Sequence, residues 1–246
     1  LVYQVLHRAM EKAVDLGYLS QNPAKRCSLP RLARKEIHPL DDKQVSALLE
    51  AAKGTPLEYL VQAALFTGMR QSELLGLTWD CVDMERGIIS INKQLPRPEQ
   101  RGPGLFATPK SGKGRTITAA PLVIRALQAQ KRRQAEMQLH VGPAWDNPHG
   151  LVFTNEIGAP MSQRTVEYQF RRIAAAAGLE CVRFHDTRHT YAVNAIRAGD
   201  DIKTVQGNLG HATAAFTLDR YAHFTEAMCQ DSAARMEAFA KDVLNL

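Results

Sequence analysis

The sequence of 246 residues lacks several features that would mark a specialised class of protein. No apolar run approaches the length that spans a bilayer, and the chain does not open with a basic and apolar leader. Cysteine is scarce and no C-x-x-C pair occurs, so neither a disulfide framework nor a zinc ribbon is indicated. We therefore expect a cytoplasmic protein without a membrane partner. The four cysteines are Cys27, Cys81, Cys181 and Cys229.

Motifs for nucleotide hydrolysis and for metal chemistry are also missing. The sequence has no G-x-x-x-x-G-K-[ST] phosphate loop and no carboxylate cluster such as two-metal nucleases use. His185 and His189 have the spacing of a zinc-protease helix, but that motif needs Glu after the first histidine and Asp186 stands there. We expect no metal and no cofactor, and a metalloprotease is kept only as an alternative.

Acidic residues are fewer than basic ones. The chain has 31 Lys and Arg against 25 Asp and Glu, a formal net charge of +6. A basic excess attracts polyanions, and nucleic acid is the commonest such partner. A merely basic enzyme would explain the charge equally well, so charge alone leaves both interpretations open.

Hydrophobic spacing divides the chain into three parts. Residues 3–16 have helical spacing that ends at Gly17. Residues 22–39 contain three prolines and no periodicity, which indicates an interdomain linker. From Leu40 onward helical patterns dominate. The linker is basic, and its cationic side chains are candidates for contacts with a DNA backbone: Lys25, Arg26, Arg31, Arg34 and Lys35.

The third part predicts a mainly α fold with a small antiparallel β-sheet (α+β). Asp41 and Gln44 form a capping box that starts one helix. Ile88, Ile89 and Ile91 indicate a strand, and residues 105–109 and 115–118 flank a Ser-Gly-Lys-Gly turn as a hairpin. Further helices are predicted over 55–67, 71–77, 121–139, 162–177, 186–198, 201–208 and 225–243.

Five short segments stand out in the order TGMRQSEL, ATPKSGKGRT, HDTRHTYA, NLGHA and DRYAHF. Together they resemble the phage-integrase family of tyrosine recombinases. The resemblance implies the DNA breaking-rejoining catalytic fold for residues 40–246. It makes residues 1–21 the truncated end of a core-binding (SAM-like) domain and residues 22–39 the basic linker. The implied activity is site-specific recombination for the integration or excision of a mobile element, on a double-stranded DNA site.

The resemblance also assigns catalytic roles. Arg70 and Arg188 would bind the scissile phosphate, since arginine stays protonated and donates paired hydrogen bonds to phosphate oxygens. Tyr221 would attack the phosphorus to form a 3′-phosphotyrosyl link and release a 5′-hydroxyl, without ATP. His185 would transfer protons or bind the phosphate, and His211 would donate a hydrogen bond to it. Tyr191 is the competing tyrosine, but it lies on the helix that presents Arg188.

Two charged positions complete the predicted site. Lys110 matches the family's hairpin lysine, which would protonate the leaving 5′-oxygen as a general acid. Lys113 lies in the same turn, and we favour Lys110 because it ends a predicted strand; Lys113 and Arg115 are then expected to contact the DNA backbone. Glu73, three residues after Arg70, is expected to hold that arginine in place. An ordinary exposed ion pair, worth less than about 1 kcal/mol, is the alternative.

The sequence leaves alternatives open for the assembly of the protein and for its activity. Recombination needs four strand cuts, so the family implies a homotetramer on DNA in a nucleoid-associated protein. The helix predicted over 225–243 would dock either on a neighbouring subunit or on its own domain. A type IB topoisomerase-like enzyme that only relaxes DNA, and a DNA-binding protein without catalysis, are the two other functions considered.

Overall fold

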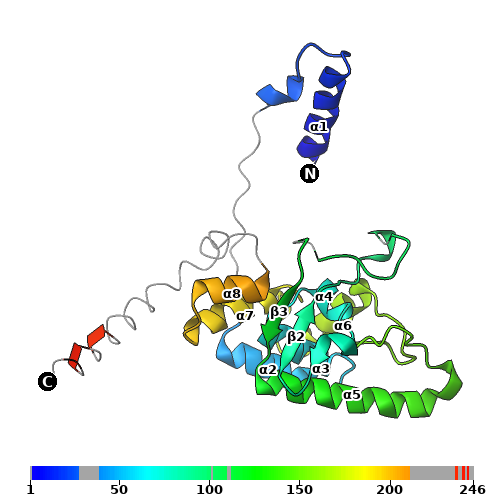
Figure 1. Cartoon of the computed structure of the whole chain (residues 1–246), viewed down its shortest axis with the longest axis vertical. Coiled ribbons are helices and arrows are strands. Elements are labelled where there is room, and N and C mark those ends of the chain that lie inside the picture. Colours follow the sequence, from blue (N-terminus) through cyan, green and yellow to red (C-terminus); the bar gives the residue numbers. More distant parts are fainter. Residues whose placement is uncertain are drawn as a thin grey trace. The chain divides into compact units, whose positions relative to one another are not determined.

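The computed structural model describes residues 2–27, 39–100, 102–109 and 112–210, together with residues 236, 237, 240, 241 and 243 (Figure 1). The chain divides into two compact units, Leu1–Glu36 and Ile37–Leu246. The larger unit carries every catalytic residue that the sequence predicted.

The smaller unit consists of α1 (Val2–Asp15) and the 3-10 helix η1 (Pro23–Arg26). Asn22 caps η1, and its side-chain amide donates a hydrogen bond to the carbonyl of His7 at 3.0 Å. Lys25 forms a 2.8 Å ion pair with Glu11 of α1. The beginning of the segment predicted as a linker is therefore folded against the first helix.

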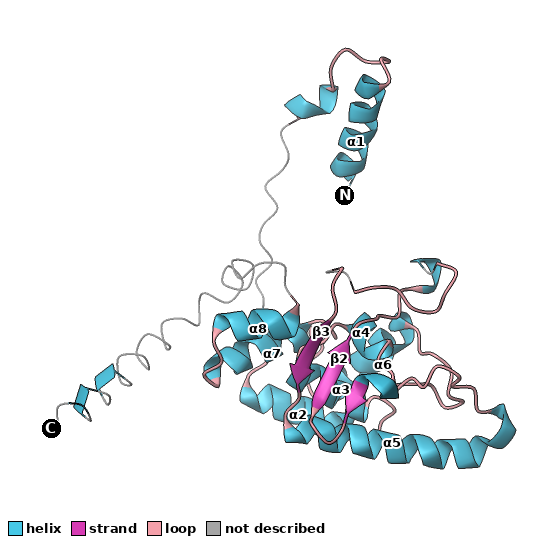
Figure 2. Ribbon diagram, in the orientation of Figure 1, coloured by secondary structure: helices cyan, strands magenta, loops and turns pink. Residues whose placement is uncertain are grey.

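The larger unit is mainly helical, and Figure 2 shows a small sheet among the helices. The sheet has three antiparallel strands in the order β1-β2-β3, where β1 is Val82–Asp83, β2 is Ile88–Ile91 and β3 is Arg115–Thr118. The predicted fold class is confirmed. The helices are α2 (Asp42–Ala52), α3 (Glu58–Thr67), α4 (Gln71–Leu75), α5 (Pro121–Val141), α6 (Gln163–Ala176), α7 (Asp186–Arg197) and α8 (Ile202–Leu209).

Helix α3 lies at the centre of the larger unit. It is apolar on all sides, as expected for a helix that packs against others all around. It contacts α2, α5 and α7, and buries Leu60, Val61 and Leu65. The helix begins at Glu58 rather than at the predicted Thr55-Pro56 pair. The end of α3 leads directly into α4, so a buried helix positions the segment that carries Arg70.

Residues 105–109 do not form the predicted hairpin strand. β3 pairs with β2 instead, with Ile89 opposite Ile117, and Ala107 makes only an isolated bridge to Gln94. Proline lacks the N–H that a strand ladder needs, and Pro109 is in this segment. The strand that was expected to end at Lys110 is therefore absent.

Helices α7 and α8 form a small apolar cluster of their own, separate from the main core. Val193 and Ile196 of α7 pack with Val205 and Leu209 of α8. This packing fixes the C-terminal end of α8 beside α7, as Figure 1 shows for the two neighbouring helices. Of the helix predicted over 225–243, the five described residues are helical and the others lie outside the described residues.

Candidate active site

Arg188 joins three segments at one point. It lies in the first turn of α7 and is only 3% exposed. Its guanidinium donates one hydrogen bond to the carbonyl of Gly68 at 2.7 Å and another to that of Leu209 at 2.5 Å. Gly68 ends α3 with φ +63°, and a Cβ there would lie 2.3 Å from a ring carbon of Tyr191. Only glycine fits this conformation and this close approach.

Arg70 and Glu73 form the pair that the sequence predicted. Nη1 of Arg70 lies 2.8 Å from Oε1 of Glu73, and the backbone N–H of Arg70 donates to Oε2 at 2.9 Å. The carboxylate side chain is fully buried while the Arg70 side chain is 21% exposed. The alternative of an exposed ion pair is therefore wrong, because Glu73 lies inside the protein and Arg70 reaches outward from it.

Arg115 of β3 takes both oxygens of the same carboxylate. Its two Nη atoms lie 2.9 and 2.7 Å from Oε1 and Oε2 of Glu73, and its Nε donates to the carbonyl of Asn208 at 2.8 Å. The side chain is 11% exposed. The sequence predicted a DNA-backbone contact for Arg115, but these three hydrogen bonds point into the protein. Side chains alternate between the two faces of a strand, so Arg115 lies on the same face as the buried Ile117. That spacing could have predicted that Arg115 points inward.

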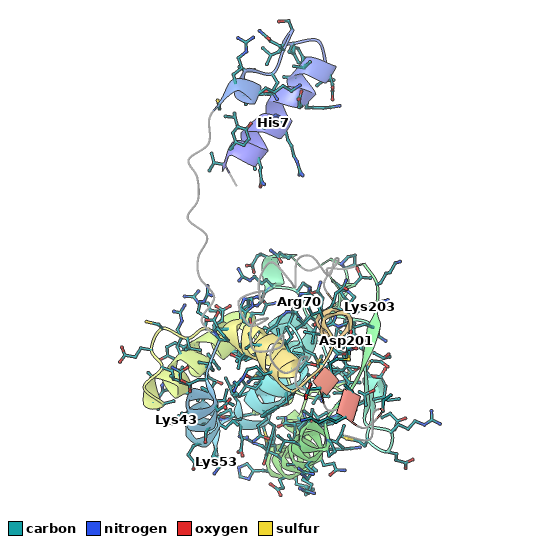
Figure 3. The ribbon with its side chains drawn as sticks, turned by 90° about the vertical axis from the view of Figure 1, so that its left-hand side faces the viewer. His7, Lys43, Lys53, Arg70, Asp201 and Lys203 are labelled. Carbon is teal, nitrogen blue, oxygen red and sulfur yellow. The ribbon has the colours of Figure 1, made fainter. Side chains whose placement is uncertain are left out.

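Three consecutive backbone carbonyls at the end of α8 accept hydrogen bonds from these arginines. Arg115 binds the carbonyl of residue 208, Arg188 that of residue 209, and Arg70 that of Gly210 at 3.2 Å. A helix C-terminus carries partial negative charge and unpaired carbonyls, so it suits guanidinium donors. Three cations from three separate segments thus meet at one helix end. In Figure 3, Arg70 lies on the same side as Lys203 of α8 and Asp201, which caps that helix, and away from Lys43 and Lys53.

His185 lies beside this cluster. It precedes α7, and its ring packs edge-on against that of His189 with centroids 5.0 Å apart. Burial lowers the pKa of His185, and the positive charge of Arg188 lowers it further. The neutral imidazole, which can accept a proton, is therefore favoured near neutral pH. His185 and Arg70 line one pocket of about 360 Å³. The pocket lining also includes Arg97, Arg171 and Glu167, together with Arg183, which is paired with Asp186 at 2.7 Å.

Comparison with known proteins decides the family. The model of the phage integrase family matches residues 38–228. This chain belongs to the phage integrase family. The family resemblance predicted from the five sequence segments is confirmed, and the match covers most of the larger unit, including all six predicted catalytic positions.

Individual relatives agree with the family. A XerC-like tyrosine recombinase of Caldanaerobacter subterraneus subsp. tengcongensis is 33% identical over 86% of this chain and 58% of its own length. An integrase of Streptomyces ambofaciens is 28% identical over 98% of this chain and 63% of its own. The Tn1549 transposon integrase, solved in complex with a circular intermediate DNA, has the same fold: TM-score 0.76, 23% identity, 94% of this chain and 77% of that one. The chain spans about 60% of the length of these curated relatives.

Several of the predicted site residues lie outside the described residues. These are Lys110, His211, Tyr221, Arg31, Arg34 and Lys35. Among the predicted DNA-backbone contacts that are described, Lys113 and Arg26 are exposed, and Lys25 is exposed and paired with Glu11. Their contacts with DNA stay predictions. His211 follows directly after Gly210, so the chain enters the undescribed segment at the arginine cluster.

Gln94 was not predicted from the sequence, because no motif or spacing pointed to it. Its side-chain oxygen accepts a hydrogen bond from the hydroxyl of Ser72 in α4 at 2.9 Å, and its amide nitrogen donates to the carbonyl of Thr108 at 2.7 Å. Gly76 lets the backbone of α4 approach, because a Cβ there would lie 2.6 Å from the backbone nitrogen of Leu95. Gln94 thereby fastens the segment before residue 110 to the helix that carries Glu73.

In the part of the chain that the structure describes, no three His, Cys, Asp or Glu side chains are grouped so that they could hold a metal ion. Among the helices of that part, none combines the length and the apolar character that crossing a membrane requires.

Glu73 should make the unfolding free energy of the protein depend on pH in the acidic range. Burial by itself would raise the pKa of Glu73, but the hydrogen bonds and charge of Arg115, aided by Arg70, outweigh it and lower the pKa from 4.5 to about 2. A depressed carboxylate pKa contributes stability above the unfolded value and loses it as pH falls through the folded value. We expect about 3 kcal/mol of unfolding free energy to be lost between pH 4.5 and pH 2 through this group.

Urea unfolding at a series of pH values measures this loss. Subtracting the curve of Glu73→Gln removes the contribution of all other acids, so the difference isolates one carboxylate. A difference that stays constant from pH 7 to pH 2 would contradict a depressed pKa.

Proposed function

We propose that this chain is the catalytic part of a site-specific DNA recombinase that cleaves and rejoins DNA through a 3′-phosphotyrosyl intermediate. One observation carries the proposal. Arg188 and Arg70, which come from different helices, are anchored on the adjacent carbonyls of Leu209 and Gly210. Two fixed guanidiniums that converge on one spot are suited to a single backbone phosphate.

The electrostatics of the cluster favour the transition state of phosphoryl transfer. Attack on a phosphodiester increases the negative charge on the two non-bridging oxygens. Each guanidinium carries five N–H donors, and those of Arg70 that are not bound to Glu73 or Gly210 can meet these oxygens. Because the protein already holds the guanidinium, little reorganisation accompanies the reaction.

The covalent steps follow from the family roles. The phenolic oxygen of Tyr221 forms a bond to phosphorus while the bond from phosphorus to the 5′-oxygen breaks. His185 accepts the phenolic proton, and Lys110 donates a proton to the leaving 5′-oxygen. The reverse sequence, with a 5′-hydroxyl from another strand as nucleophile, restores the phosphodiester. The phosphotyrosyl bond conserves the energy of the original bond, so no ATP is needed.

Duplex DNA is the proposed partner. The pocket beside Arg70 adds the cationic side chains of Arg97 and Arg171, which can follow a phosphate backbone away from the cleaved bond. The related Tn1549 integrase was solved with DNA. We further propose a homotetramer on DNA, with the segment 225–243 docking on a neighbouring subunit, in a nucleoid-associated cytoplasmic protein.

A covalent trapping experiment tests the function. The 246-residue chain is mixed with a pool of duplexes that carry a nick within randomised flanking sequence, so that a cleaved strand fragment diffuses away and rejoining is blocked. We expect adducts that survive SDS, with the DNA joined through its 3′-phosphate and a free 5′-hydroxyl on the released end. The enriched duplex then serves as the substrate of all further assays.

Two outcomes would contradict the proposal. Binding without any SDS-resistant adduct would indicate a DNA-binding protein that does not catalyse cleavage. Adduct formation with relaxation of a supercoiled plasmid, but no exchange of strands between two copies of the enriched site, would indicate a topoisomerase-like enzyme.

A further inference from the structure

We propose that Arg115 is a positioning residue for phosphate binding, which acts on Arg70 through Glu73. The inference rests on the proposed function, because Arg70 must first be a phosphate-binding group. Arg115 is not expected to touch DNA, since its side chain is 11% exposed and directed at a buried carboxylate. The nearby basic residue Lys113 is exposed, and its contact with the DNA backbone stays a prediction.

The first argument concerns how many hydrogen bonds Glu73 can accept. A carboxylate offers about four lone-pair positions. Arg115 takes one on each oxygen, at 2.9 and 2.7 Å, while one Nη and the backbone N–H of Arg70 take the other two. With Arg115 in place, Glu73 therefore binds the Arg70 side chain through a single nitrogen. Without it, the carboxylate is free to turn and bind Arg70 through both nitrogens, which would withdraw donors from the phosphate.

The second argument concerns the place from which Arg115 acts. Its Nε donates to the carbonyl of Asn208, two residues before the Gly210 carbonyl that receives Arg70. Gly210 has φ +63°, and a Cβ there would lie 2.9 Å from Nη1 of Arg115. Arg115 thus sets the spacing between β3, α4 and the end of α8. Both groups that hold Arg70, Glu73 and the end of α8, are held in turn by Arg115.

Neutral phosphate substrates distinguish this role from simple support of the fold. A methylphosphonate at the scissile position lacks one anionic oxygen, so its cleavage depends less on a guanidinium. We expect Arg115→Lys to lower the rate of adduct formation by about 10- to 100-fold on the phosphodiester, because Arg70 is displaced. On the methylphosphonate the same variant should fall by less than about threefold. Lysine keeps a charge beside Glu73 but cannot form the two-pronged contact.

Matched variants keep the result interpretable. Arg70→Ala should show the same preference for the neutral substrate, and its failure to do so would count against the proposed role of Arg70. Arg197→Lys breaks a two-pronged pair with Asp42 on the exposed end of α7, and should leave both rates unchanged. If the Arg115→Lys variant does not fold, the double variant Glu73→Gln/Arg115→Gln is used in its place. It removes both partners, so it leaves no buried charge unpaired.

The outcomes separate the inference from the function. A wild-type chain that forms no adduct removes the proposed function. Normal adduct formation, with an Arg115→Lys defect equal on the two substrates, overturns the inference alone, since it would show that Arg115 only supports the fold. An Arg115→Lys variant that reacts at the wild-type rate on the phosphodiester would also overturn the inference.

Discussion

Replacing Tyr221 with phenylalanine should abolish covalent adduct formation on the nicked substrate. Phenylalanine has no oxygen to bond to phosphorus, so the decrease should exceed about 10⁴-fold while DNA binding is retained. SDS gel electrophoresis of the trapped complex measures the first quantity, and a filter-binding titration at fixed salt measures the second.

Two other tyrosines provide matched controls. Tyr191 is the competing nucleophile, but burial raises the pKa of its phenol and its oxygen accepts a hydrogen bond from Asn208 at 3.0 Å. Tyr168 is exposed on α6. Phenylalanine at either position should leave the adduct in place. An adduct of equal abundance from Tyr221→Phe, or loss of the adduct in Tyr191→Phe, would show that the nucleophile is not Tyr221.

Replacing Arg188 with alanine should lower the rate of adduct formation by about 100- to 1,000-fold, the usual effect of removing one donor to a developing oxyanion. Arg188→Lys should recover little of this, because an ammonium group cannot reach the carbonyls of Gly68 and Leu209 and the phosphate together. Single-turnover cleavage of the enriched duplex measures both variants.

Stability must be followed in the same experiment, because Arg188 also ties the end of α3 to the end of α8. Circular dichroism melting separates loss of fold from loss of charge stabilisation. Arg197→Ala, on the same helix but half exposed, is the control and should react at the wild-type rate. An Arg188→Lys variant that is folded and fully active would remove Arg188 from the phosphate site.

The helices were predictable because their sequence signals are local. Asp41 and Gln44 form the expected capping box, and the apolar periodicity placed α6, α7 and α8 within one or two residues of their observed bounds. Hydrophobic spacing at short range is enough to place such elements. The pairing of β3 was not predictable in this way. Its partner, β2, lies across a long proline-containing connection, and the nearer segment at 105–109 offered a simpler hairpin.

The direction of Arg115 shows the same limit at the level of one residue. Its sequence context, beside Lys113 and a glycine-rich turn, is typical of an exposed basic loop. Only the fold brings Glu73 and the carbonyl of Asn208 to it, from positions 42 and 93 residues away along the chain. A buried carboxylate attracts the nearest guanidinium because an unpaired charge in the interior is costly.

The sequence alone determined the family and the helical character of the larger unit, and it predicted two arginines as phosphate-binding candidates, since these follow from residue types at short, ordered spacings. The tertiary structure decided that Glu73 is buried between two guanidiniums, that three arginines meet on consecutive carbonyls of one helix end, and that Arg115 faces inward. The physical reason is the range of the interactions. Periodicity and capping act over a few residues, whereas charge pairing in the interior depends on which distant segments the folded core brings together.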